Sequence, residues 1–314
     1  MLLSGWRLKA LIASMVGAAA SYLLVALVSG WHDVIHAVVR VGAPGIAAML
    51  LMSSLNYLLR FARWQSYLRA MAHKLPWRAH LRIYLSGFAL TTTPGKAGEA
   101  LRSVFLKRYG VEYHDSLAAL LSERLSDLVA VLLIALAGLS LYPRFRVVVI
   151  LCLAAIVFGL IVLARGIGLS WLEQQGDRLG PRLGRTSTHL ATLLRRAQRC
   201  HGARLVVASA VLGVLAWGAE ALAFAWVTHW LGIDVSARYA VFVYAVSMLA
   251  GAVSVLPGGL GGAEATMVAL LLIQKAPFSD AVAATLLIRI STLWFAVGLG
   301  LVALLAQQRQ GGGA

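Results

Sequence analysis

Long apolar runs separated by short basic segments dominate the pattern of this chain. A membrane-spanning helix needs about 20 consecutive apolar residues. The runs that we expect to form spans are Leu8–Val28, Pro44–Leu59, Leu117–Leu141, Val147–Ala164, Leu205–Leu231 and Ala281–Leu305. Because Pro44–Leu59 is short by itself, we expect it to continue into Phe61–Leu68. The pattern therefore predicts an all-α, polytopic helical bundle that is integral to a membrane.

Two further regions, Leu81–Tyr109 and Tyr239–Ile273, each contain a short apolar run, a Pro-Gly break and a second short run. Each run is too short to cross a bilayer comfortably, so we expect re-entrant hairpins or pairs of broken helices. Non-helical backbone at membrane depth is tolerated only inside protein or against a water-filled cavity. The two breaks are therefore the first place to look for a functional site.

The broken regions belong to an internal repeat. The first copy opens with T-P-G-K-A-G-E-A and closes with E-R-L-S-D-L, and the second opens with L-P-G-G-L-G-G-A-E-A and closes with I-R-I-S-T-L. Glu99 and Arg124 are 25 positions apart, and so are Glu264 and Arg289. An acid and a base at one separation, each pair behind a Pro-Gly break, indicate a duplicated unit.

The repeat divides a single transmembrane domain, residues 1–314, into four parts. We expect an extra first span (1–30), a first repeat (44–141), a connecting span with a basic cytoplasmic arm (142–204) and a second repeat (205–305). A signal peptide is the alternative for the first apolar run.

Positive charge predicts the orientation of these parts. Lys and Arg concentrate in residues 60–82, 96–115 and 165–204, which the positive-inside rule assigns to the cytoplasm. Both termini then lie inside the cell, and the two breaks open to opposite faces. The repeat is thus predicted to have inverted topology, an architecture whose binding site lies near the bilayer midplane.

Composition agrees with a membrane protein. The chain has 314 residues, of which 60% are hydrophobic and 13% charged, whereas soluble proteins carry about 25% charged residues. The net charge of +16 would fit nucleic-acid binding, but the basic residues lie in blocks between apolar runs, as juxtamembrane charge does. The two cysteines and eight histidines show no metal-ligand spacing. We therefore expect no nucleic-acid partner, no metal and no cofactor.

Two basic features are assigned to the membrane surface. His189–Cys200 has the amphipathic pattern of an interfacial helix, with a solvated connector as the equal alternative. Asn56, Arg60, Arg63 and Trp64 end the second apolar run and are interpreted as interface anchors.

Residues of the two breaks are candidates for substrate binding. They are Pro94, Gly95, Lys96 and Gly98 in the first copy, and Pro257, Gly258, Gly259, Gly261 and Gly262 in the second. Glycine admits positive φ and lets a ligand approach the backbone, and the helix that follows points its N–H groups at the break. Such a break can bind an anion such as a lipid phosphate, although a packing kink without a ligand is the alternative.

The paired charges are the next candidates. Glu99 and Glu264 lie in the first turn after each break, and Arg124 and Arg289 lie inside apolar spans. An intramembrane charge costs about 2.5–3.5 kcal/mol on insertion scales, so we expect the pairs Glu99–Arg124 and Glu264–Arg289. Either the pairs are structural, or each arginine exchanges its glutamate for a substrate phosphate through bidentate hydrogen bonds.

Three further charged residues complete the substrate-binding candidates: Arg102, Asp127 and Glu220. Arg102 follows the first break, where it adds positive charge that the second copy lacks. Asp127 and Glu123 lie on either side of Arg124. Glu220 stands alone in an apolar span, and an intramembrane acid is a functional candidate by default.

The motifs T-P-G-K-A-G-E-A-L-R, E-R-L-S-D and P-G-G-L-G-G-A-E-A resemble the flippase-like family named for the transmembrane region of lysylphosphatidylglycerol synthase. The resemblance extends from about Pro44 to Leu305. It implies movement of a lipid or lipid-linked molecule between leaflets. The best-known members also carry a soluble aminoacyl transferase domain. This chain has only a glycine tail after Gln310, so we expect that synthase activity to be absent.

We therefore expect a lipid transporter or flippase, not an enzyme, that moves an anionic or lipid-linked substrate across the bacterial cytoplasmic (inner) membrane. Membrane lipids are its expected partners, and a homo-oligomer and a lipid-synthesising enzyme are further partners left open. One alternative is a non-transporting accessory subunit. The other is an integral membrane transferase, against which stands the lack of an acidic metal pair, a nucleophile–base set or a nucleotide loop in the sequence.

Overall fold

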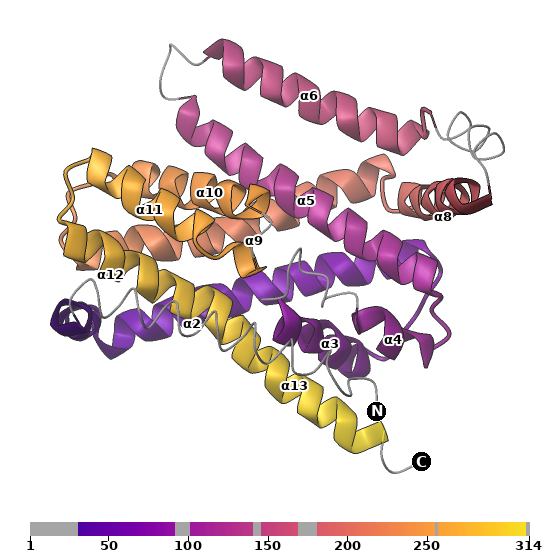
Figure 1. Cartoon of the computed structure of the whole chain (residues 1–314), viewed down its shortest axis with the longest axis horizontal. Coiled ribbons are helices and arrows are strands. Elements are labelled where there is room, and N and C mark those ends of the chain that lie inside the picture. The colour runs from indigo at the N-terminus through magenta and orange to yellow at the C-terminus, as the bar shows by residue number, and fades with distance from the viewer. Residues whose placement is uncertain (1–30, 92–100, 141–145, 169–180, 255–256, 312–314) are drawn as a thin grey trace.

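The computed structural model of the chain describes residues 31–91, 101–140, 146–168, 181–254 and 257–311. Throughout these ranges every regular element is helical, and most helices run along one long axis (Figure 1). The predicted all-α bundle is confirmed. The described helices that are long and apolar enough to cross a membrane are Ile35–Ala70, Arg146–Arg165, Ala203–Trp230 and Phe278–Gln307.

The described elements fall into a first half, a connection and a second half. The first half contains α2 (Trp31–Ala70), α3 (Trp77–Ser86), the 3-10 turn η1 (Gly87–Leu90), α4 (Leu101–Lys107) and α5 (Tyr113–Leu139). The connection contains α6 (Arg146–Arg165) and α8 (Pro181–Gln198). The second half contains α9 (Ala203–Trp230), α10 (Ala237–Val253), the 3-10 turn η4 (Pro257–Gly259), α11 (Gly262–Ile273), α12 (Phe278–Arg289), η5 (Ile290–Trp294) and α13 (Phe295–Gly311). The predicted first span, Leu8–Val28, lies outside the described residues.

The second predicted span is part of α2, a helix of 40 residues. As expected, Pro44–Leu59 continues into Phe61–Leu68 without a break. The helix is interrupted earlier, at Gly42, whose φ of 65° is readily adopted by glycine and disfavoured for other residues. α2 therefore extends deep into the bundle beyond the apolar run that predicted it.

The second broken region folds as a helical hairpin. α10 ends at Val253, the chain turns through η4, and α11 packs back against α10. With 17 and 12 residues at 1.5 Å per residue, the two helices are about 25 and 18 Å long, shorter than a bilayer core of about 30 Å. The predicted second break is confirmed, and most of the first break, at residues 92–100, lies outside the described residues.

Several helix boundaries of the two halves are separated by a nearly constant number of positions. α2 and α9 end 160 positions apart, and a positive φ follows each, at Ala72 (69°) and Gly232 (70°). α3 and α10 then begin with the same spacing. α5 and α12 begin 165 positions apart, again after residues with positive φ, Gly110 (77°) and Lys275 (62°). These matched boundaries begin with α2 and α9, upstream of the breaks.

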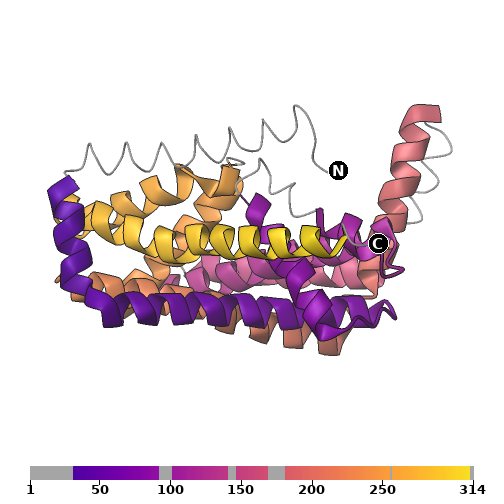
Figure 2. The same ribbon diagram turned by 90° about the horizontal axis from the view of Figure 1, so that it is seen from below.

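The two halves pack against each other through equivalent elements. The segment that corresponds to α5 is the continuous run of α12, η5 and α13. α5 packs on α10, and α13 packs on α3 in the equivalent way. α2 lies along α9 (Figures 1 and 2). In Figure 1, α2 runs from left to right and α9 from right to left, so these equivalent helices are antiparallel. Each of these contacts between the halves therefore has an equivalent contact in which the two halves change places.

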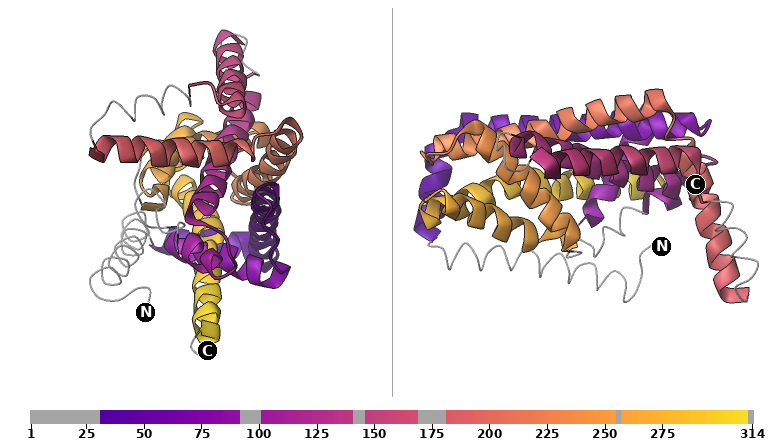
Figure 3. Two further views of the ribbon diagram at one scale, coloured as in Figure 1. Left: turned by 90° about the vertical axis from the view of Figure 1, so that its right-hand side faces the viewer. Right: turned by 90° about the horizontal axis from the view of Figure 1, so that it is seen from above.

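α6 and α8 lie at the edge of this bundle. No residue of α6 is buried, and the helix lies beyond α5 (Figure 1). α8 crosses the long axis of the bundle (Figure 3), and its Arg196 contacts Asp115 of α5 at 3.0 Å. The crosswise direction of α8 suits a helix at a membrane surface, and a solvated connector remains the alternative.

The contact of α13 with η1 offers a test of the packing. A Cβ atom on Gly300 would lie 2.1 Å from the main-chain nitrogen of Ala89, whereas one on Gly298 would meet nothing within 4 Å. We expect Gly300→Ala to lower Tm in detergent by several degrees. Gly298→Ala should keep or raise Tm, because alanine favours a helix by about 0.8–1.0 kcal/mol. Size-exclusion of heated samples measures both, and equal Tm values would contradict this contact.

Candidate functional site

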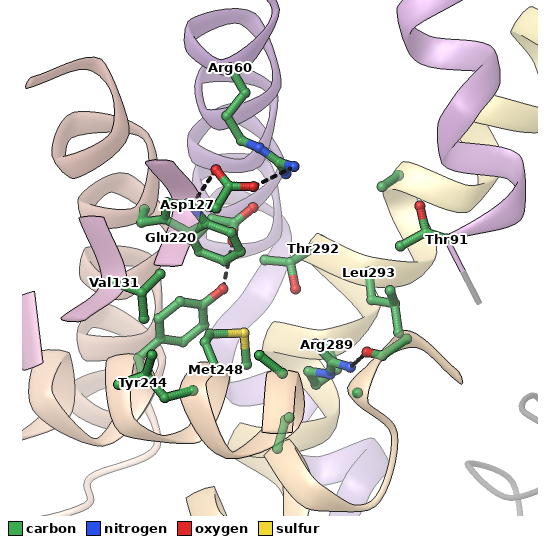
Figure 4. A pocket seen from close by; sticks show the side chains of 18 of the residues that line it. Arg60, Thr91, Asp127, Val131, Glu220, Tyr244, Met248, Arg289, Thr292 and Leu293 are labelled. Atoms are coloured by element: carbon green, nitrogen blue, oxygen red, sulfur yellow. Dashed lines mark hydrogen bonds and ion pairs between the residues drawn. The ribbon is translucent and has the colours of Figure 1, made fainter. Parts of the chain in front are cut away.

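A cavity of about 360 Å³ lies between the two halves (Figure 4). Most of the residues that line it form pairs related by the repeat. At the spacing of 160 positions the pairs are Tyr57 and Trp217, Arg60 and Glu220, Phe88 and Met248, and Thr91 and Gly251. At the spacing of 165 they are Arg124 and Arg289, Asp127 and Thr292, Leu128 and Leu293, and Val131 and Ala296. The cavity therefore lies where the two halves meet through equivalent positions.

Glu123 of α5 is fully buried beside this cavity, accepts hydrogen bonds from Arg60, Arg102 and Tyr84, and forms an ion pair with Arg124. Arg102 Nη1 lies 2.9 Å from its Oε2 atom. Arg124 Nη2 lies 3.1 Å and Arg60 Nη2 3.4 Å from its Oε1 atom. The hydroxyl of Tyr84 also donates to Oε1, at 2.8 Å. The carboxylate is thus surrounded by donors from α2, α3, α4 and α5.

Asp127 lies one helical turn further along α5 and is bound in the same way. Arg60 Nη2 and Arg124 Nη2 each lie 3.1 Å from its Oδ2 atom. Arg63 donates to Oδ1, and the indole N–H of Trp217 donates to Oδ1 at 3.0 Å. Because Trp217 belongs to α9, this carboxylate links the first half to the second.

Four arginines and two carboxylates make up this network, so its described part carries an excess of positive charge. Three of the arginine side chains are at most 9% exposed, whereas Arg124 is 26% exposed. The guanidinium of Arg124 is therefore the one in the network that a ligand in the cavity can reach most easily.

The network corrects the interpretation of Asn56, Arg60, Arg63 and Trp64 as interface anchors. All four side chains are buried, and both arginines bind carboxylates of α5. The interpretation was wrong because α2 continues past its apolar run and packs against α5 inside the bundle. Arg60 and Arg63 therefore lie in the core of the bundle, where a charged side chain must be paired.

In the second half, Arg289 makes the predicted ion pair with Glu264. Arg289 Nε lies 2.6 Å from Glu264 Oε1, and Arg289 Nη2 donates to the carbonyl oxygen of Gly258 at 2.9 Å. Glu264 stands in the first turn of α11, as expected. One side chain thus joins α12 to the break and to the helix that follows it. The equivalent pair, Glu99–Arg124, includes a residue outside the described ranges and stays a prediction.

The helix after Arg289 is wider than an α-helix. η5 is a π-helical segment, and the hydroxyl of Tyr57 donates to the main-chain carbonyl of its Thr292. Single π-helical turns are frequent at functional sites because they displace groups from the regular hydrogen-bond ladder. Thr292 and Leu293 of this segment line the cavity (Figure 4).

Glu220 of α9 is also buried, at 4% exposure, and accepts a hydrogen bond of 2.6 Å from the hydroxyl of Tyr244. Among the described residues, no lysine or arginine lies within ion-pair distance of it. In the repeat Glu220 corresponds to Arg60, and Tyr244 corresponds to Tyr84, the donor to Glu123. Each half thus keeps a tyrosine–glutamate hydrogen bond but supplies the glutamate from a different helix.

The backbone of the second break depends on glycine. Gly258, Gly259 and Gly261 have φ of 64°, 71° and 82°, a region that residues with a side chain rarely adopt. A Cβ atom on Gly259 would lie 3.1 Å from the carbonyl oxygen of Gly251 on α10. The break therefore packs closely on α10 while Gly258 and Gly259 line the cavity.

The cavity brings together part of the predicted site. The predicted substrate-binding residues that line it are Arg124, Asp127, Glu220, Gly258, Gly259 and Arg289. Arg102 and Glu264 each bond to a neighbouring residue of the site, while Pro257, Gly261 and Gly262 shape the second break. The residues Pro94, Gly95, Lys96, Gly98 and Glu99 lie outside the described residues. The substrate-binding role of the whole set stays a prediction.

Sequence reasoning missed the aromatic donors of the site, Tyr57, Tyr84, Trp217 and Tyr244. An aromatic residue in an apolar run gives no sign of whether it donates to a buried carboxylate or lies at a membrane interface. The spacing of 160 positions that relates these residues is present in the sequence. It becomes recognisable only once the helix boundaries are known.

The arrangement offers recognition by charge and hydrogen bonds between apolar walls. Within the described ranges, no group of three or more His, Cys, Asp or Glu side chains is placed to hold a metal ion. A ligand with a negative group and an apolar body matches this combination.

A double-mutant cycle tests the Glu264–Arg289 pair. Glu264→Gln leaves the guanidinium of Arg289 buried without its counter-charge, which typically costs about 3–5 kcal/mol, so we expect a clearly lower Tm. Adding Arg289→Gln should recover much of that loss, because neither member of the pair then carries a charge. As a control, Glu112→Gln changes an acid that is 68% exposed and should keep the wild-type Tm. Strictly additive losses would contradict a coupled pair.

Comparison with known proteins agrees with this architecture. The family model described as the lysylphosphatidylglycerol synthase TM region matches residues 10–300. A UPF0104 membrane protein of Pyrococcus horikoshii is 23% identical over 313 residues, which cover 90% of this chain and 92% of the relative. A UPF0104 membrane protein of Methanothermobacter thermautotrophicus is 25% identical over 252 residues, which cover 72% and 74%. The chain is a polytopic helical membrane protein and belongs to the family of the lysylphosphatidylglycerol synthase TM region.

Proposed function

We propose that this protein is a transporter without enzymatic activity that moves an anionic lipid or lipid-linked headgroup between the leaflets of the bacterial cytoplasmic membrane. The observation that carries the proposal is the cavity. Equivalent residues of two halves line it, and positive charge exceeds negative charge in the described network beside it. A lipid-related role in a membrane also fits the family.

The antiparallel halves support transport. We interpret them as an inverted-topology repeat with both termini in the cytoplasm and with α10–α11 as a re-entrant hairpin. Transporters of this architecture bind their substrate near the bilayer midplane at the interface of the repeats. Access alternates when one repeat moves against the other. The cavity lies at the corresponding interface in this protein.

The arginines support an anionic headgroup. Arg60 and Arg289 lie on opposite sides of the cavity (Figure 4), and Arg124 also lines it. A guanidinium group binds two phosphate oxygens at once in its planar geometry. Arg124 is the best placed for this role because its side chain is 26% exposed, compared with 9% for Arg60 and 6% for Arg289.

The remaining wall supports a lipid rather than a free anion. The apolar side chains that line the cavity are Phe88, Leu128, Val131, Met248, Leu249, Leu293 and Ala296. Ligand sites typically combine such walls with a few polar groups that fix orientation. In this proposal the headgroup contacts the arginines while the start of the lipid tail contacts the apolar wall.

Reconstitution into liposomes tests the transport function. Wild type should move fluorescent phosphatidylglycerol between leaflets faster than an uncharged lipid with the same tails. Arg124→Gln removes a charge-assisted hydrogen bond, worth about 1.5–3 kcal/mol, so we expect phosphatidylglycerol transfer to fall roughly 10-fold or more. Dithionite quenching of the outer leaflet measures the rate.

Arg108→Gln is the matched control, because Arg108 is an exposed arginine just after α4 and should retain the wild-type rate. An Arg124→Gln protein that folds and still transfers phosphatidylglycerol at the wild-type rate would place the headgroup elsewhere. A wild type that moves neither lipid would contradict phospholipid transport and favour an accessory role.

A further inference from the structure

Glu220 lines the cavity, and its carboxylate forms no ion pair with any of the described residues. Its described partner is the hydroxyl of Tyr244 at 2.6 Å, and no described lysine or arginine lies within ion-pair distance. The other described acids of the site, Glu123, Asp127 and Glu264, each contact at least one arginine. A buried acid without a counter-charge in an apolar helix is costly and is a functional candidate for that reason.

The surroundings of Glu220 explain why it stays without an ion pair. The charged and titratable groups that face it are Tyr57 and Arg60 on α2, Asp127 on α5, Tyr244 on α10 and Arg289 on α12. Both arginines are engaged elsewhere, since Arg60 contacts Asp127 at 3.1 Å and Arg289 contacts Glu264 at 2.6 Å. A negative charge on Glu220 therefore lies near positive groups that are already shared with other carboxylates.

A proton fits this site better than a metal ion. Within the described ranges, no group of three or more acidic, histidine or cysteine side chains is placed to hold a metal ion beside Glu220. The described hydrogen-bond partner of Glu220 is instead a single neutral donor, the Tyr244 hydroxyl at 2.6 Å. A carboxyl group buried in this way can lose its charge by taking up a proton from water in the cavity.

We propose that Glu220 takes up and releases one proton in each transport cycle and so couples headgroup movement to the proton gradient; this inference rests on the proposed transport function. The proton moves between a carboxylate oxygen of Glu220 and cavity water, and no bond to the substrate forms or breaks. A protonated Glu220 is neutral, so the excess positive charge of the neighbouring network remains available to an anionic headgroup.

Release of the proton reverses this balance. The ionised Glu220 becomes a further carboxylate beside Arg60, its counterpart in the repeat, and competes with the headgroup for positive charge. The affinity for an anion then falls, so a singly charged headgroup travels together with one proton. The first half has Arg60 at this position, so the two halves differ in charge at the proposed proton site.

Carbodiimide labelling tests the proton site without knowledge of the cargo. Dicyclohexylcarbodiimide modifies protonated carboxyl groups in apolar surroundings, and peptide mass spectrometry locates the adduct. In wild-type protein in liposomes we expect Glu220 to be labelled at acidic pH and progressively less as the pH rises. Glu123 and Asp127 of the same site are internal controls and should stay unlabelled, because each is ion-paired with arginines. No label on Glu220 at acidic pH, or a label independent of pH, would overturn the proposal.

A second experiment tests the coupling. In liposomes with an imposed pH gradient, the wild-type transfer rate of fluorescent phosphatidylglycerol should change several-fold relative to liposomes without a gradient. Glu220→Gln, which is neutral at every pH, should lose this response. Glu112→Gln, an exposed acid outside the cavity, should keep it.

The outcomes separate the two proposals. Wild-type transfer that ignores the gradient overturns coupling and leaves the transporter in place. Glu220 labelled as expected but no phosphatidylglycerol transfer overturns the transport of this lipid, and with it the coupling, while Glu220 remains a proton site.

Discussion

The pairing of four arginines, three of them buried, with Glu123 and Asp127 is the interaction on which the rest of the structure depends. A guanidinium in apolar surroundings is tolerated when it is paired and hydrogen-bonded, and removal of one partner typically costs about 3–5 kcal/mol. Arg60 and Arg63 come from α2 and Arg102 from α4, so the two carboxylates of α5 hold three helices together. Hydrogen bonds with fixed directions define this packing more strictly than apolar contacts would.

The second half repeats the helices but not this charge. At the positions equivalent to Glu123 and Asp127 it has Ile288 and Thr292, and its Arg289 bonds instead to Glu264 and to the carbonyl of Gly258. The two sides of the cavity therefore differ in chemistry although their backbones correspond. A duplicated fold can in this way present a dense ionic network on one side and a glycine-rich break with a π-helical segment on the other.

Several features of the site were predictable because they follow from local rules. A Pro-Gly sequence between two short apolar runs predicts a break, and the second break is present between α10 and α11. The cost of an intramembrane charge predicts a partner for Arg289, and the equal spacing in the two copies identified Glu264. Asn56, Arg60, Arg63 and Trp64 show the limit of the same rules, because charge after an apolar run has the same pattern whether it lies at a membrane surface or in a core.

The sequence by itself therefore determined the helical membrane architecture, the break between α10 and α11 and the pairing of Glu264 with Arg289. These properties depend on hydrophobic length and on the energetic cost of an unpaired charge, and both can be evaluated along the chain. Only the tertiary structure decided that Arg60 and Arg63 bind the carboxylates of α5, that Tyr244 donates to Glu220, and that equivalent residues meet around one cavity. Those contacts join helices far apart in the chain, and they exist because of where the helices cross, which no local pattern encodes.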